Sequence, residues 1–280
     1  METIFGLDAS LQSWLEEDIG GGDVTTLALV GEGLETTGII HAKDTGVLAG
    51  VDVARRVFEL LEPRIFFNTK LKDGAKLTPG TIIAAVHGDA RAILTGERLA
   101  LNLLQHMSGV ATQTARLAAI AAPYGAKLVD TRKTTPGLRL LDKYAVRVGG
   151  GSNHRLGLYD AILIKDNHIK VAGGIQAALA RAHEYASHMM KIEIEVESLE
   201  GVDEALAGGA DVIMLDNMAP DAMAKAVKKV DHRAIIEASG GISEETIEAV
   251  AKSGVDIISV GALTHTVKAL DISMDVGEIK

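Results

Sequence analysis

Residues 211–262 read DVIMLDNMAPDAMAKAVKKVDHRAIIEASGGISEETIEAVAKSGVDIISVGA and decide the fold of the second half of the chain. Three short apolar runs, at 211–215, 234–238 and 256–260, are separated by helical patterns at 220–229 and 244–252. Strands that alternate with helices of about 10–15 residues are typical of βαβ units and a parallel sheet. Each apolar run stops abruptly at charged or glycine-rich residues, as expected where a strand of such a sheet ends.

The same alternation extends back toward about residue 110. The further strands are predicted at 127–130, 161–164 and 192–197, and the further helices at 175–186 and 198–207. Six or seven such units favour a compact (β/α) barrel over an open dinucleotide-binding sheet. The Gly-x-Gly-x-x-Gly fingerprint after a first strand is also missing, because the triple glycine at 149–151 follows a helical pattern.

The first third of the chain has a different pattern. From residue 36 to about residue 93, glycine-containing turn signals separate short apolar runs, with one helical stretch at 51–62. This spacing predicts a small α+β sheet domain. A helix is then expected over Glu97–Met107, with an apolar stripe on one face and Arg98 on another.

The composition excludes several classes of protein. Of 280 residues, 47% are hydrophobic and 24% are charged, so an ordinary core is available and the chain is not disordered as a whole. The absence of cysteine excludes disulfide frameworks, iron–sulfur clusters and thiol catalysis. A net charge of −10, with only one Trp, four Tyr and four Phe, argues against nucleic-acid binding. We expect no membrane span, no secretory signal and a cytoplasmic location.

Positive charge is concentrated in one segment of this acidic chain. Between Lys127 and Lys165 there are eight Lys and Arg residues against three Asp, a local charge of +5 that leaves −15 for the rest. A basic segment of this kind focuses the electric field on a local anionic ligand. The alternative is a solvated basic loop without a ligand.

The predicted strand ends bring polar residues to one edge of the sheet. In a (β/α) barrel, functional residues lie at the C-terminal ends of the strands. Ordinary loop chemistry explains one polar junction, but five in phase indicate a shared site. These five ends are Thr131-Arg132-Lys133, Lys165-Asp166-Asn167-His168, Asp216-Asn217, Ser239-Gly240-Gly241 and Gly261-Ala262.

The strand IEIEVE at 192–197 places three glutamates on one face by its period-2 alternation. If helices cover the outside of the barrel, Glu193 and Glu195 point into it. A buried carboxylate must meet a cation, a metal or another partner. For Glu193 we favour a structural bridge to Lys165 or Arg155, and for Glu195 we favour a ligand role.

Two carboxylates at neighbouring strand ends predict a metal site. Glu195 and Asp216 are expected on adjacent strands of the sheet. Mg²⁺ is commonly held by one or two carboxylates together with substrate oxygens. We therefore predict that this pair binds Mg²⁺, directly or through water.

The last two strand ends predict a phosphate site. Loops after the last strands of such barrels commonly bind phosphate through backbone N–H groups and a helix N-terminus. Ser239–Gly241 leads into a helix and Val260–Ala262 ends the next strand, and their glycines let the backbone approach an anion closely. For Ser243, a simple helix N-cap is an equally good interpretation.

The basic side chains near these ends exceed what one phosphate needs. They are Arg132, Lys133, His154, Arg155 and Lys165. They predict a second anion with carboxylates of its own, because the Arg guanidinium matches a carboxylate bidentately. A Schiff base at Lys165 and a general base at His154 are the alternatives, and we favour a charged lysine and a positively inclined substrate contact.

Three long blocks of the chain resemble the quinolinate phosphoribosyltransferase family. They are DTRKTTPGLR at 130–139, KYAVRVGGGSNHR at 143–155 and LIKDNHI at 163–169. Shorter blocks extend the likeness over nearly the whole chain, at 17–26, 97–109, 195–199, 215–217, 237–242 and 260–265.

The resemblance implies the type II phosphoribosyltransferase fold. In that fold an N-terminal α/β sandwich domain, here over 1–109, precedes an incomplete (β/α) barrel, here over 110–265. The last segment, 266–280, is implied to pack back onto the sandwich.

The resemblance also implies the reaction and the role of each site residue. Quinolinate would react with 5-phosphoribosyl 1-pyrophosphate (PRPP), with Mg²⁺, to give nicotinate mononucleotide, pyrophosphate and CO₂. The residues implied to bind quinolinate are Thr131, Arg132, Lys133, His154, Arg155 and Lys165. The residues implied to bind the phosphate of PRPP are Ser239, Gly240, Gly241, Val260, Gly261 and Ala262. The residues implied to be catalytic are Lys133, Lys165, Glu195 and Asp216, of which the last two also serve the ribose hydroxyls and the metal.

The family likeness further implies a shared active site. Arg98 would reach into the site of a partner subunit, so the active unit would be at least a homodimer, with a hexamer left open. The alternative for Arg98 is an exposed helix charge. Two positions depart from the usual pattern, with His106 in place of Arg and Val148 in place of Cys, and they put in doubt at most subunit contacts and affinity.

Two rival functions are weighed against this one. A molybdenum-associated paralogue of the family would act on another acceptor, but it generally lacks the complete Asn-His-Arg and Lys-Asp-Asn-His blocks present here. A non-catalytic barrel that binds sugar phosphates would be marked by loss of Arg132, Lys165, Glu195 or Asp216, and all four are present.

Overall fold

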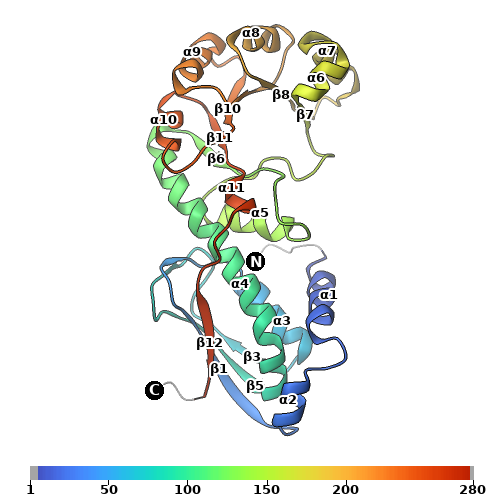
Figure 1. Ribbon diagram of the computed structural model, residues 1–280, viewed down its shortest axis with the longest axis vertical. Helices are drawn as coiled ribbons and strands as arrows, with labels where there is room; N and C mark the ends of the chain where they lie inside the picture. The colour runs from blue at the N-terminus through green and yellow to red at the C-terminus, as the bar shows by residue number, and fades with distance from the viewer. Residues whose placement is uncertain (1–5, 278–280) are drawn as a thin grey trace. The chain divides into compact units, whose positions relative to one another are not determined.

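The structure is a computed structural model that describes residues 6–277 (Figure 1). The chain divides into two compact units. The first takes the residues up to Gln113, Leu140–Gly149 and the segment from Val267 onward, and the second takes Thr114–Arg139 and Gly150–Thr266. Within the described residues, no helix combines the length and apolar character that crossing a membrane requires.

An antiparallel sheet forms the centre of the first unit, in the strand order β12-β1-β5-β3. Its strands are β1 (Glu35–Ala42), β3 (Phe66–Asn68), β5 (Ile82–Asp89) and β12 (Ile272–Val276). A short ladder pairs β2 (Gly46–Val47) with β4 (Lys76–Leu77). Because β12 pairs with β1 in the register Gly38↔Val276 to Ala42↔Ile272, the late segment completes a sheet that the early segment begins.

The first unit contains α1 (Leu7–Ile19), α2 (Val24–Leu29), α3 (Val51–Leu61), most of α5 (Arg139–Val148) and most of the long helix α4 (Ala90–Ala121). Both α1 and α3 bury apolar side chains, whereas the buried residue of α2 is Thr26. In α3, Val53, Val57 and Phe58 lie on one side and are fully buried, as the helical spacing of the sequence predicts. This unit is the predicted α+β sheet domain.

The helix expected over Glu97–Met107 is much longer in the structure, where α4 covers Ala90–Ala121. Gly96 and Gly109 lie just outside the expected range, and in the structure both are inside the helix at points of close packing. A Cβ at Gly96 would lie 2.9 Å from Leu61 Cδ1, and a Cβ at Gly109 would lie 3.2 Å from Ala269 Cα. These glycines therefore permit close approach instead of ending the helix.

The second unit is built on a parallel sheet of six strands among the described residues, in the order β6-β11-β10-β9-β8-β7. The strands are β6 (Lys127–Val129), β7 (Ile162–Ile164), β8 (Ile192–Val196), β9 (Val212–Asp216), β10 (Ile235–Ser239) and β11 (Ile257–Ser259). All six were predicted to within a residue or two. β6 and β7 are the two edges and do not pair with each other, so the barrel is incomplete, as the family likeness implied.

Helices follow the strands and cover the sheet (Figure 1). They are α6 (Asp166–Ala172), α7 (Ile175–Tyr185), α8 (Leu199–Ala207), α9 (Pro220–Val230), α10 (Ile247–Lys252) and the short α11 (Ala262–His265), with a 3₁₀ turn at Ala122–Tyr124. The sequence did not predict α6 and α11, and of the helices that it predicted in this unit only α10 departs clearly, because it begins three residues late. The backbone N–H of Ser243 donates to Thr246 Oγ1 at 2.9 Å, and this turn makes Thr246, not Ser243, the N-cap residue.

Candidate active site

The C-terminal strand ends of the second unit lie along one edge of its sheet, because the six strands run parallel. The predicted residues are distributed along this edge: Thr131, Arg132 and Lys133 after β6, Lys165 after β7, Glu195 in β8, Asp216 at the end of β9, Ser239 at the end of β10 and Val260 after β11. A bridge from Ser152 to Val129 brings the segment that carries His154 and Arg155 beside β6. The structure thus assembles the predicted barrel residues at one place.

Two guanidinium groups in this site each have a buried nitrogen without a partner. The Nε atoms of Arg132 and Arg155 make no hydrogen bond within the described part of the chain. Arg155 donates from Nη1 to the carbonyl of Ala161 at 3.0 Å, which holds its side chain in place. Burial and the neighbouring Arg132 lower the pKa of Arg155. Such buried donors with no acceptor indicate a site for an anion.

A buried acid holds the segment that carries Arg155. Asp130, at the end of β6, is fully buried and accepts hydrogen bonds from Asn153 Nδ2 at 2.6 Å and from the His154 backbone N–H at 2.8 Å. Hydrogen bonds to a carboxylate are among the stronger ones in proteins. Asp130 therefore fixes the backbone just before the arginine.

His154 lies between two buried carboxylates. Its Nε2 is 3.1 Å from Glu193 Oε2 and 3.6 Å from Glu237 Oε1, and its side chain is 12% exposed. Its Nδ1 accepts the backbone N–H of Arg155 at 2.7 Å. Because a ring nitrogen that accepts carries no proton, this geometry favours a neutral imidazole. The substrate contact predicted for His154 stays a prediction.

Burial and the charge of Glu193 raise the pKa of Glu237 to about 7. Together with His154, the two carboxyl groups offer three ligand atoms within 4.8 Å of one another, so their types and spacing are compatible with a metal ion. The predicted bridge of Glu193 to Lys165 or Arg155 is wrong. Asp130 holds the backbone of the 153–155 segment by a hydrogen bond to the His154 N–H, and the side chain of His154 is therefore the one that contacts Glu193.

Lys165 pairs instead with Glu195, with 2.9 Å between Nζ and Oε1. The inward face predicted for β8 is confirmed, since the side chain of Glu193 is 8% exposed and that of Glu195 is 15% exposed. Asp216 ends the adjacent strand β9, in the register that pairs Glu195 with Met214. Two carboxylates on neighbouring strands suit a hard cation that takes further oxygen ligands from a substrate.

The turn after β10 requires glycine. Gly240 and Gly241 have φ values of 92° and 58°, in the region that other residues avoid. A Cβ at Gly240 would lie 2.9 Å from the backbone nitrogen of Asn217, whose N–H donates to the Ser239 carbonyl. Asn217 itself has φ 54°, so the backbone of two neighbouring strand ends is folded into unusual conformations at this point.

The turn after β11 approaches a lysine closely. A Cβ at Gly261 would lie 3.1 Å from Lys133 Cδ and 3.0 Å from the ring of His265. The buried hydroxyl of Thr264 donates to the Lys133 carbonyl at 2.7 Å, which ties this turn to the segment after β6. The two glycine-rich turns and Lys133 therefore form one polar surface, which can accept a phosphate group.

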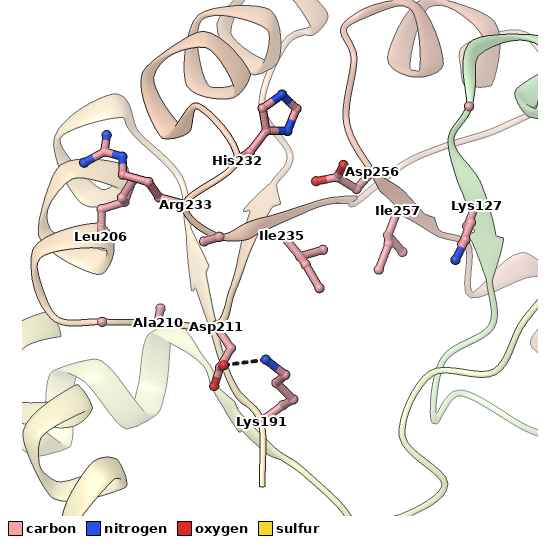
Figure 2. Close-up of a pocket in the computed structure, with 13 residues that line it drawn as sticks. Lys127, Lys191, Leu206, Ala210, Asp211, His232, Arg233, Ile235, Asp256 and Ile257 are labelled. Carbon is pink, nitrogen blue, oxygen red and sulfur yellow. Dashed lines mark hydrogen bonds and ion pairs between the residues drawn. The ribbon is translucent and has the colours of Figure 1, made fainter. Parts of the chain in front are cut away.

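A separate cavity of about 760 Å³ opens at the N-terminal ends of the same strands (Figure 2). Its acids have structural roles. Asp211 pairs with Lys191 at 2.6 Å and accepts the backbone N–H of Ile192, and Asp256 accepts that of Ile236. None of the predicted site residues lines this cavity, so we do not assign it to the site.

Comparison with known proteins agrees with the geometry. The family model "Quinolinate phosphoribosyl transferase, N-terminal domain" matches residues 23–108, and the model of the C-terminal domain matches residues 110–275. The chain belongs to this family.

Relatives of this chain are similar over most of their length. A probable nicotinate-nucleotide pyrophosphorylase (carboxylating) of Bacillus subtilis is 48% identical, over 95% of this chain and 92% of that protein. The chloroplastic enzyme of Arabidopsis thaliana is 42% identical, over 97% and 83%. The solved structure of NadC from Streptococcus pyogenes has a TM-score of 0.95 at 43% identity and covers 100% of this chain and 99% of that one.

Some residues of this family member were missed or stand apart from the barrel site. Sequence reasoning assigned no role to Asp130, Asn153, Glu237 or His265. Glu237 had a signal, since it is the one charged residue in the apolar run 234–238. Arg98 lies on α4 in the first unit, where its side chain is 61% exposed and 3.8 Å from Glu97. Its predicted role in a partner's site stays a prediction.

Proposed function

We propose that this protein transfers the phosphoribosyl group of PRPP to quinolinate, with decarboxylation, to give nicotinate mononucleotide, pyrophosphate and CO₂. The observation that carries the proposal is the pair of guanidinium groups, Arg132 and Arg155, whose buried Nε atoms have no protein acceptor among the described residues. Two forked cations at the edge of a barrel suit a small dianion with two carboxylates. Family membership and the names of the relatives support the same reaction.

Quinolinate would lie on the basic side of the site. Its two carboxylates would be held by Arg132, Arg155 and the ammonium groups of Lys133 and Lys165, with Thr131 and His154 beside them. Lys165 is half-exposed and paired with Glu195, which supports a contact to the substrate over a Schiff-base role. The substrate would complete hydrogen bonds that the protein leaves open.

The phosphate of PRPP would bind at the two glycine-rich turns. Ser239, Gly240 and Gly241 would offer backbone N–H groups on one side, and Val260, Gly261 and Ala262 on the other. The close approach of Lys133 to Gly261 adds a positive charge there. A cradle of N–H groups with one cation is a common phosphate site.

Glu195 and Asp216 would hold Mg²⁺ and the ribose hydroxyls. Carboxylates on adjacent strands are suitable donors, and a bound Mg²⁺ would supply charge neutralisation for the departing pyrophosphate. Lys165 would hold the carboxylate of Glu195 in position through its 2.9 Å contact. The negative charge of this carboxylate would then favour the positive charge that develops on the ribose.

The reaction itself needs mainly orientation and charge. The ring nitrogen of quinolinate attacks C1′ of the ribose as the C1′–O bond to pyrophosphate breaks. The ring, now cationic, stabilises the electron pair left on the ring carbon when the C–C bond breaks and the adjacent carboxylate leaves as CO₂, and this carbon then takes up a proton from water. Lys133 and the arginines would hold the two anions together, and such positioning accounts for several kcal/mol of a reaction barrier, about 7 or more in favourable cases.

The assembly proposed is at least a homodimer in which Arg98 of one subunit completes the site of the other. The exposure of Arg98 supports this role, because the side chain is free to meet a second copy. A hexamer stays open, and the cytoplasmic location stays a prediction.

One coupled assay tests the function. Purified protein is mixed with PRPP, Mg²⁺ and either quinolinate or nicotinate, and nicotinate mononucleotide and CO₂ are quantified. Product from quinolinate alone is the expected result. If PRPP binds saturably but quinolinate gives no product, the proposed function is wrong, and the result favours the rival function of a paralogue that acts on another acceptor. A melting temperature that rises with ribose phosphates but does not change with quinolinate would indicate a non-catalytic barrel.

A further inference from the structure

Two buried acids of the barrel have no place in the chemistry described above. The side chain of Glu193 is 8% exposed and that of Glu237 is 3% exposed. Within residues 6–277, one oxygen of each, Oε1 in both cases, has no hydrogen-bond partner. Burying two carboxylates side by side lowers the stability of the fold. The strands β8 and β10 pair with β9 through backbone hydrogen bonds, to which these side chains contribute nothing. Their position beside His154 indicates what they do.

The hydrogen bonds around His154 have a direction. The Arg155 backbone N–H donates to Nδ1 at 2.7 Å, so Nδ1 carries no proton and Nε2 does. The Nε2–H then donates to Glu193 Oε2 at 3.1 Å, while Glu237 Oε1 lies 3.6 Å away on the same side of the ring. The carboxylate acceptor at Nε2 therefore keeps the ring proton on that nitrogen, and Nδ1 can accept the backbone N–H of Arg155.

We propose that Glu193 and Glu237 are positioning residues for the pair His154–Arg155. They keep the ring proton of His154 on Nε2, and the unprotonated Nδ1 then accepts the backbone N–H of Arg155. The inference rests on the proposed function in one respect, namely that Arg155 binds a carboxylate of quinolinate.

Three anchors converge on the arginine. Asp130 takes the N–H of His154 at 2.8 Å, Nδ1 of His154 takes the N–H of Arg155, and the carbonyl of Ala161 takes Nη1 at 3.0 Å. With the backbone and one end of the guanidinium fixed, the buried Nε, which has no acceptor among the described residues, is left available to a ligand. A site that binds a rigid aromatic dianion gains affinity from such preorganisation.

A metal ion in the same cluster is the competing assignment. The ligand atoms of His154, Glu193 and Glu237 lie within 4.8 Å of one another. A histidine that ligates a metal normally donates its other N–H to a neighbouring acceptor. Here the second nitrogen accepts an N–H instead, so the ligating nitrogen would have to be the protonated one. The geometry therefore points to positioning and not to a metal.

The tautomer is measured directly by NMR of protein labelled with [¹⁵N]histidine. Two-bond ¹H–¹⁵N correlations distinguish the Nε2–H form, the Nδ1–H form and the imidazolium, and His154→Gln identifies the signal. The expected form in the unliganded enzyme is Nε2–H, and in Glu193→Leu this form is lost. An imidazolium or an Nδ1–H form in the wild type would overturn the proposal. So would a shift of Nε2 on addition of one equivalent of Zn²⁺ or Mn²⁺, which would establish the metal site.

Kinetics give the second readout. Glu193→Leu is expected to raise the KM for quinolinate by about tenfold and to leave the KM for PRPP within about threefold, as other supporting contacts do when removed. Glu193→Gln keeps an oxygen that accepts from Nε2–H and should restore the tautomer and most of the affinity. Glu184→Gln, an exposed acid on α7, is the matched control. Equal effects of Glu193→Leu on both KM values would contradict the proposal. If the wild type makes no nicotinate mononucleotide, the proposed function fails, and the NMR experiment still decides the tautomer.

Discussion

The ammonium of Lys165, which follows β7, lies 2.9 Å from the carboxylate of Glu195 on the neighbouring strand β8. The two opposite charges hold each other in position at the C-terminal edge of the barrel. Removing one leaves the other uncompensated at the point where an anionic substrate would bind.

Lys165→Ala is therefore expected to abolish most of the activity without unfolding the protein. Loss of one charge that stabilises a reacting group typically lowers kcat/KM by about 100-fold or more. Steady-state kinetics with quinolinate and PRPP measure the effect, and circular dichroism checks the fold. Lys170→Ala is the control, because Lys170 pairs with Asp166 at the same 2.9 Å on an exposed helix. Similar losses in both variants would contradict a role for Lys165 in the site.

Two adjacent glycines separate backbone strain from steric conflict. Gly240→Ala and Gly241→Ala both place a Cβ at positive φ, which costs about 1–2 kcal/mol each. Only the first also puts the Cβ against Asn217. We expect Gly241→Ala to lose a little stability, and Gly240→Ala to raise the KM for PRPP by about tenfold as well, because the phosphate turn is displaced. Denaturation curves and PRPP titrations of the two variants test this, and equal KM values would contradict it.

The raised pKa of Glu237 makes stability depend on pH. Burial raises this pKa from 4.5 to about 7, so between these values the folded protein binds a proton that the unfolded chain releases. The contribution of Glu237 therefore becomes destabilising as pH rises through this window and is complete above about pH 7.

Glu237→Gln should remove that dependence. The stability gain of the variant over the wild type is expected to grow from about pH 5 to about pH 8 and to reach at most about 3 kcal/mol. Urea denaturation at several pH values measures it, with Glu248→Gln on the surface as the control. A difference that stays constant with pH would show that Glu237 does not titrate in this range.

Subunit complementation tests the predicted role of Arg98. Arg98→Ala and Arg155→Ala should each be inactive alone. If Arg98 of one subunit completes the partner's site, mixed dimers contain one intact site, and coexpression should restore about a quarter of the wild-type activity. Activity is compared with that of each variant expressed alone. Absence of restored activity in purified mixed dimers would place Arg98 in its own subunit's site or outside any site.

The fold was predictable where local patterns decide it. The apolar runs of the barrel gave all six strands, and the alternation of 192–197 placed Glu193 and Glu195 inside. The pattern failed at Gly96 and Gly109, because close packing against distant segments keeps these glycines inside α4.

The pairing of site residues was less predictable than their identity. Period-2 alternation shows that Glu193 faces inward, but its partner comes from a segment about forty residues earlier, which Asp130 holds in place. No local sequence pattern predicts that this carboxylate contacts His154 and not Lys165. The direction of the hydrogen bond at Nδ1 likewise depends on the backbone of Arg155 and emerges only in three dimensions.

The pairing of β12 with β1 has a consequence for biosynthesis. Every strand of the barrel precedes β12 in the chain, so a ribosome finishes the whole catalytic unit before it delivers the strand that completes the first sheet. Until then the edge of β1 is unpaired, and unpaired edges invite association with other chains. During translation, a nascent chain stalled before Ile272 would therefore be a preferred client for chaperones.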